Sequence, residues 1–224
     1  MKYLNPFYPK LKIQQLFYLP IPLVHAMHKA FNRRYADFYL DNGTDDAEEA
    51  IDQVLQAFSQ PFGLKAHQRL IYMGTIMALA TRSTFEYYKI NDNRVDMVLN
   101  KAIKWLDTND PVSDGLAKQI FFDRETVREN ESLNDAYYLY FHLLNSLTSD
   151  SAYDSTMEIL YVSLLGDAIS AQPEERRNLF NWWLSEVVPL AYLLQLPLTF
   201  GFGNQDGHLF GSDLPSVRLV PIAS

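Results

Sequence analysis

Apolar residues surround almost the whole circumference of one predicted helix, residues 178–198, which reads NLFNWWLSEVVPLAYLLQLPL. Polar positions form only a narrow strip through Asn181 and Ser185. A helix that is apolar on nearly every side belongs in the interior of a protein, because no face of it is suited to water. We therefore predict that this segment forms the centre of the core, with Trp183 inside it.

Two residues limit what this central segment can do. Pro189 has no amide hydrogen, so we expect the helix to kink where the Ser185 carbonyl loses its partner. An unpaired buried carboxylate is costly, so we expect Glu186 at the rim of the core, with a functional carboxylate as the alternative. Together with Asn181 and Gln195, these residues interrupt the apolar run before the roughly 20 residues that a membrane span requires. We therefore do not expect a membrane span.

Apolar residues recur every three or four positions through most of the remaining chain, which is typical of amphipathic helices. Clusters of Gly, Pro, Asn and Asp separate these stretches. The predicted helices cover residues 22–42, 46–60, 64–89, 94–107, 132–147 and 153–168 and the central segment after Pro173, with one or two short helices in 114–130.

The chain of 224 residues is long enough for a single domain with a substantial core. Short connections place consecutive helices antiparallel. The predicted fold is therefore all-α, a single-domain array or bundle of seven to eight mostly antiparallel helices in residues 1–200. Residues 1–21 are interpreted as an extended aromatic arm, and residues 201–224 as an irregular Gly-rich tail.

The composition excludes several classes of function. The chain contains no cysteine, which excludes thiol catalysis, disulfides and Cys-ligated metal sites. Its formal net charge is -8, which argues against nucleic-acid binding because phosphates are neutralised by clustered Lys and Arg. The weak resemblance of residues 10–26 to a targeting signal is rejected, because prolines break the apolar run and the helical pattern continues past the cleavage point. We expect a cytoplasmic protein.

An acidic cluster, DDAEE, begins at Asp45. Asp45 followed by Glu48 resembles a capping box at the start of a helix, where exposed amides favour negative charge. This capping role explains the cluster without a metal. The alternative is a magnesium-diphosphate site formed by Asp45, Asp46 and Glu49, which would require a second, facing acidic motif.

Other candidate chemistry is weaker. His25 and His28 have a spacing that two metal ligands can use, but they fall on the predicted solvated face of their helix. The glycines after Gly201 lack the strand and the helix that a dinucleotide fingerprint needs. Phosphate-loop, nucleophile-elbow and zinc-protease motifs are absent from the sequence. We expect no metal, no cofactor and no catalytic residue.

Aromatic residues make up 14% of the chain and often occur in adjacent pairs. Neighbouring residues on a helix cannot share one face, so one aromatic of each pair points to a second helix, a ligand or a partner. Partly exposed Tyr and Trp suit interfaces. The candidate binding residues are therefore three carboxylates of the acidic cluster, four aromatic residues from the adjacent pairs and the central carboxylate: Asp45, Asp46, Glu49, Tyr87, Tyr88, Tyr138, Trp182 and Glu186.

The function that these features favour is a non-enzymatic protein–protein interaction, such as an acidic inhibitor or immunity-type protein that masks a basic partner. It predicts a large uncovered aromatic and acidic surface together with no deep polar pocket. The alternative is a small-molecule-binding protein or enzyme with an apolar pocket between helices, which predicts a cavity above roughly 300 Å³ with converging ionisable groups. A protein partner or self-association is expected, a small apolar ligand is left open, and nucleic acid and membrane are not expected.

Overall fold

A computed structural model describes residues 18–38, 43–88, 90, 92–110, 112–113, 115–121, 130–170 and 173–194 of the chain. Helices dominate this part of the molecule, and its only β-type pairing is an isolated bridge between Tyr35 and Asp45. The prediction of an all-α fold is confirmed. Most of the predicted arm and the whole predicted tail lie outside the described residues, so the domain boundaries stay predictions.

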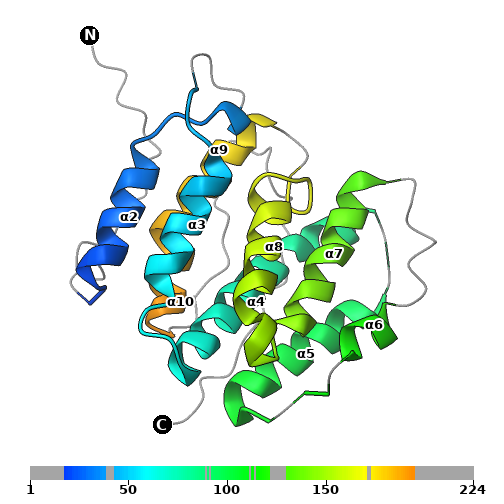
Figure 1. The fold of residues 1–224 in the computed structure, drawn as a ribbon. Helices are drawn as coiled ribbons and strands as arrows, with labels where there is room; N and C mark the ends of the chain where they lie inside the picture. Colours follow the sequence, from blue (N-terminus) through cyan, green and yellow to red (C-terminus); the bar gives the residue numbers. More distant parts are fainter. Residues whose placement is uncertain are drawn as a thin grey trace.

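The helices follow one another through short connections (Figure 1). In chain order they are α2 (Ile21–Phe31), η1 (Ala36–Phe38), α3 (Ala47–Phe58), α4 (Leu64–Tyr87), α5 (Asn93–Thr108), α6 (Leu116–Ile120), α7 (Glu131–Asn145), η3 (Ser149–Ser151), α8 (Ala152–Leu164), α9 (Pro173–Trp182), the π-helical turn η4 (Trp183–Val187) and α10 (Val188–Tyr192).

The long helix α4 contacts α5, α7, α8 and α10 and so joins the two sides of the bundle. Gly74 allows the closest approach, because a Cβ there would lie 3.1 Å from Ile159 Cδ1 and 3.2 Å from Leu143 Cδ1. One turn later, the Tyr140 hydroxyl of α7 donates to the Ala78 carbonyl at 2.7 Å.

The central segment lies in the core, as predicted. Trp183 is fully buried, and Phe180 packs its ring 5.5 Å from that of Trp183 and 5.2 Å from that of Tyr35. Glu186 is exposed, which confirms its place at the rim. Of the helices in the described residues, none combines the length and apolar character needed to cross a bilayer.

The helix responds to Pro189 with a π-helical turn. The Val188 amide donates to the Trp183 carbonyl, five residues back, and α10 then begins with Pro189 in its first turn. In this wider turn the hydrogen bonds join residues five apart instead of four, directly before Pro189, which has no amide hydrogen to donate. Such turns occur frequently at functional sites, but Pro189 gives this one a structural cause, and we assign no site to it.

The predicted helix 22–42 is wrong beyond Phe31. The chain turns at Asn32, whose side chain donates to a carbonyl of the last turn of α2 at 2.8 Å. The Tyr35 hydroxyl folds back to another carbonyl of that turn at 2.7 Å. Arg177 of α9 donates to the Phe31 carbonyl at 2.6 Å. Tertiary hydrogen bonds thus complete the end of α2, and Tyr35 and Phe38 reach the core from a loop and a short 3-10 helix instead.

The predicted start of α3 is displaced by one residue. Asp46, and not Asp45, is the N-cap, and its carboxylate accepts from the amides of Glu48 and Glu49 at 2.8 and 3.3 Å. Asp45 is instead held by its backbone bridge to Tyr35. The predicted helix over 153–168 also ends earlier, at Leu164.

Candidate functional site

Two stretches of sequence without any Lys or Arg come together in the fold. Residues 35–64 and residues 129–175 contain only acidic charges. The first stretch supplies α3 and the second supplies α7 and α8, and these three helices lie next to one another across one face of the molecule (Figure 1). This face of the bundle therefore carries carboxylates without any cation from its own helices.

Tyrosines and carboxylates alternate along the contact between these helices. The Tyr153 hydroxyl of α8 donates to Asp52 Oδ1 of α3 at 2.9 Å. The Tyr138 hydroxyl of α7 donates to Glu158 Oε2 of α8 at 3.3 Å. We call the face formed by these groups and their neighbours the acidic tyrosine surface; its residues are Asp46, Glu48, Asp52, Tyr138, Tyr153, Asp154, Glu158 and Tyr161.

The negative field of this surface acts on its own tyrosines. Burial first, and then the carboxylates of Glu48, Asp52, Glu158 and Asp46, raise the pKa of Tyr161. Burial and the hydrogen bond to Asp52 raise the pKa of Tyr153, and Asp154 adds to the effect. Burial disfavours charge of either sign, whereas the contribution of the carboxylates to the raised pKa also favours a nearby positive charge. The acidic tyrosine surface is therefore suited to a cationic group from outside.

The tyrosines also hold the carboxylates in place. Asp52 accepts from the Tyr153 hydroxyl on Oδ1 and from Gln56 Nε2 on Oδ2, at 2.9 and 2.6 Å, and each oxygen has a second lone pair that a Lys or Arg could use. At the α7 edge, the Tyr138 ring lies 4.3 Å from the His142 ring and 6.5 Å from the Phe141 ring, between centroids. Half-buried rings of this kind offer faces for cation–π contact. The surface thus combines fixed acceptors with aromatic area.

The predicted acidic cluster divides between two environments. Asp46 caps α3 and contributes to the acidic tyrosine surface. Asp45 and Glu49 act instead on the Tyr35 hydroxyl, whose pKa is raised to about 12 mainly by burial. The Glu49 side chain accepts from Gln53 at 2.7 Å. The structure does not bring these three carboxylates to one point, and no metal-binding group of three or more side chains occurs among the described residues.

The other predicted binding residues lie elsewhere. Tyr87 and Tyr88 are at the end of α4, where their rings meet edge to face at 5.0 Å, and Tyr87 is 79% exposed. Trp182 is half-buried on α9, and Glu186 is exposed on η4. Of the predicted residues, Asp46 and Tyr138 are the two that contribute to the acidic tyrosine surface.

Sequence reasoning missed the α8 half of this surface and two of its carboxylates on α3. The missing residues are Glu48, Asp52, Tyr153, Asp154, Glu158 and Tyr161. The signal that points to them is the absence of Lys and Arg over residues 129–175, a stretch long enough to contain two complete helices. The pairing of that stretch with α3 is a tertiary contact that no local pattern reveals.

A polar pocket of about 340 Å³ lies between the end of α4 and the start of α5. Arg82 lines it and pairs with Glu86 and Asp96, each at 3.4 Å. Asp92, at its edge, accepts from Arg94 at 2.6 Å and from the Tyr137 hydroxyl at 2.6 Å. Two guanidinium groups pair with three carboxylates here, and the Tyr137 hydroxyl adds a hydrogen bond, so we assign the network to joining α4, α5 and α7.

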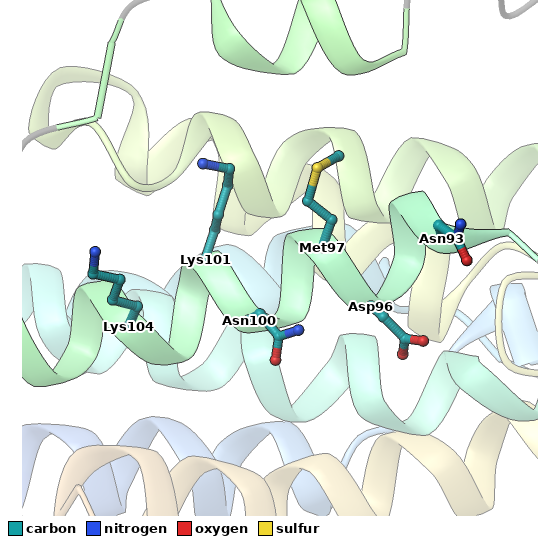
Figure 2. A pocket seen from close by; sticks show the side chains of 6 residues that line it. All are labelled: Asn93, Asp96, Met97, Asn100, Lys101 and Lys104. Carbon is teal, nitrogen blue, oxygen red and sulfur yellow. The ribbon is translucent and has the colours of Figure 1, made fainter.

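A shallow hollow of about 500 Å³ follows the exposed side of α5. All of its lining side chains come from this one helix, and they spread to either side without converging on a point (Figure 2). Met97, which is 37% exposed, lies between Asp96 and Lys101. A one-helix surface with mixed charges offers no arrangement that selects a ligand.

Comparison of the chain with protein-family models, curated proteins and solved structures gave no significant match. Function is therefore argued from the site alone.

Proposed function

We propose that this protein is a non-enzymatic interaction protein that binds a basic partner on its acidic tyrosine surface. The observation that carries the proposal is the meeting of α3, α7 and α8, three helices without Lys or Arg, with carboxylates held by tyrosine hydroxyls. A partner that presents Lys or Arg would meet acceptors that are already oriented. Masking such a partner, as an inhibitor or immunity-type protein does, is the role that this surface supports best.

Electrostatics gives the proposal its expected signature. Complementary charge accelerates association and sets specificity, and salt screens it over a distance of about 8–10 Å. Binding on the acidic tyrosine surface should therefore weaken as ionic strength rises. The aromatic part of the interface should be much less sensitive to salt.

The alternative function, a small-molecule binder or enzyme, is favoured by the pocket at the α4–α5 corner. Its volume of about 340 Å³ meets the size expected of a ligand site. Its ionisable lining residues are Arg82, Glu86, Asp92 and Asp96. Each ionisable side chain that lines the pocket already pairs with another group of the protein, and we therefore rank this function second.

Charge reversal tests the primary proposal. In Glu48→Lys/Asp154→Lys, two exposed carboxylates of the surface become cations, while the hydrogen bonds of Tyr153 and Tyr138 remain. We expect this variant to bind a fluorescent poly-lysine peptide at least about tenfold more weakly at low salt, which corresponds to about 1.4 kcal/mol. In capture from a lysate of the native host, the basic protein retained by the wild type should be lost.

The matched control is Asp107→Lys/Asp110→Lys, which changes the net charge equally at exposed positions at and just beyond the end of α5. It should bind poly-lysine as the wild type does, apart from a small general effect of net charge. Equal losses in the two variants would show that only the total charge matters, and the proposed surface would be rejected. The cytoplasmic location expected from the sequence stays a prediction.

A further inference from the structure

One end of the bundle carries four large apolar side chains that remain exposed. Tyr18 precedes α2 and is 74% exposed. Ile21 is the first residue of α2 and is 85% exposed. Phe62 and Leu64 lie in the connection from α3 to α4 and at the start of α4, and they are 69% and 60% exposed. We call these four residues the apolar end.

The antiparallel packing of α2 against α3 brings the two pairs to the same end. Lys29, late in α2, donates to Gln53 in the middle of α3 at 2.9 Å. Ile21 lies eight residues before Lys29 in α2, and Pro61, next to Phe62, lies eight residues after Gln53 beyond the end of α3. Because the two helices are antiparallel, Ile21 therefore lies opposite the connection that contains Phe62. The first turn of α2 and the connection from α3 to α4 accordingly lie at the same end of the molecule (Figure 1).

The charge around the apolar end differs from that of the rest of the chain. Residues 18–31 and 59–69 contain no Asp or Glu, although the chain has a net charge of -8. The exposed charged side chains in these two stretches are Lys29 and Lys65. Two copies of an acidic protein repel each other through their acidic faces. The two stretches that carry the apolar end therefore add no carboxylate to this repulsion.

The exposed apolar area matches what one side of a dimer contact requires. With roughly 150–250 Å² per aromatic side chain, Tyr18 and Phe62 together expose on the order of 200–350 Å². Ile21 and Leu64 add on the order of 100–200 Å². A standard interface buries about 800 Å² per partner, of which somewhat more than half is apolar. The apolar end thus supplies most of that apolar share.

We infer that the apolar end is the contact surface of a homodimer, in which a second copy of this chain covers Ile21, Phe62 and Leu64. The contact is isologous, with the same residues on both copies, as in most symmetric dimers. It does not depend on the acidic tyrosine surface, which begins at the opposite end of α3, where Asp46 caps the helix. A dimer of this kind carries the acidic tyrosine surface twice.

Sedimentation equilibrium of the full chain from about 1 to about 100 μM tests the inference. The wild type should dimerise, and Phe62→Ser/Leu64→Ser should raise the dimer dissociation constant by at least about tenfold. Ile21→Ser should weaken the dimer by a smaller factor. All three side chains are exposed, so the variants should keep the circular dichroism spectrum of the wild type.

The matched control is Tyr87→Ser, which removes an apolar side chain that is 79% exposed at the opposite end of α4. It should dimerise as the wild type does. Dimerisation should also persist at high salt, whereas binding of poly-lysine should not. The dimer and the binding of a basic partner are therefore tested separately, and either proposal can be rejected without the other. A wild type that stays monomeric, or a dimer insensitive to the Phe62 and Leu64 changes, overturns the inference. So does a monomeric wild type that co-sediments with phosphatidylcholine–phosphatidylserine vesicles, because the apolar end would then belong to lipid.

Discussion

Asp92 makes more polar contacts than any neighbouring residue at the α4–α5 corner, and its replacement is the sharpest test of the packing described above. Its carboxylate caps α5 by accepting from the Arg94 amide at 2.9 Å. It also accepts from the Arg94 guanidinium at 2.6 Å and from the Tyr137 hydroxyl of α7 at 2.6 Å. The side chain is only 11% exposed, and that of Arg94 is 30% exposed.

The magnitude follows from what each replacement leaves behind. Asp92→Ala removes a helix cap worth about 1 kcal/mol and strands the Tyr137 hydroxyl and the Arg94 charge, so we expect a loss of about 3–5 kcal/mol in unfolding free energy. Asp92→Asn keeps an oxygen for the cap and for Tyr137 but removes the charge, and we expect a loss of about 1–3 kcal/mol. Domains of this kind have about 5–15 kcal/mol in total, so Asp92→Ala should be close to unfolding.

Urea unfolding followed by circular dichroism measures these losses. The pH dependence of the unfolding free energy separates the contribution of the Asp92 charge from that of the helix cap. Burial raises the pKa of Asp92, but the hydrogen bonds from Arg94 and Tyr137 outweigh it and leave the pKa below its ordinary value of 3.8. The unfolded state therefore takes up a proton first, and the stabilisation is present above pH 3.8 and is lost as pH falls through the lower folded pKa. The gap between the wild type and Asp92→Asn should close in that range.

Two results would refute this reasoning. One is a loss below about 1 kcal/mol for Asp92→Ala, which is what an exposed ion pair would give. The other is strict additivity of Asp92→Asn and Tyr137→Phe, because residues that share a buried hydrogen bond are expected to couple by about 0.5–3 kcal/mol.

Two further predictions concern the connections between helices. Gly166→Ala should lower the unfolding free energy by about 1–3 kcal/mol, because the new Cβ would lie 2.6 Å from Asp135 Oδ2. That oxygen cannot move freely, since it accepts from a backbone amide of the α8–α9 turn at 2.8 Å. A thermal melt with an unchanged midpoint would contradict this prediction. Burial lowers the pKa of His67 below 6.5, although its hydrogen bond to the Ser146 carbonyl raises it. The unfolded state protonates first as pH falls, so wild-type stability should decrease below about pH 6.5, and urea midpoints of His67→Gln should lack that decrease.

The helical segments could be predicted because their apolar positions repeat with helical period. α4, α5 and the start of α9 match the predicted ranges to within a few residues. The errors fall where a distant residue ends a helix: Arg177, 146 positions from Phe31, binds the last turn of α2. The same holds for the candidate site, because Asp52 meets Tyr153 across 101 positions of sequence. The pattern of neighbouring residues in the sequence gives no information about either contact.

The sequence by itself determined the all-α class, the burial of the segment around Trp183 and the acidic character of the chain, since each follows from composition or from the spacing of apolar residues along one helix. Tertiary structure alone decided that α3, α7 and α8 share a face, that Asp45 and Asp46 lie in different environments, and that the four side chains of the apolar end are exposed. The physical reason is that the helical period of the sequence determines on which face of a helix a side chain lies. Which other helix covers that face is determined by how all the helices pack together.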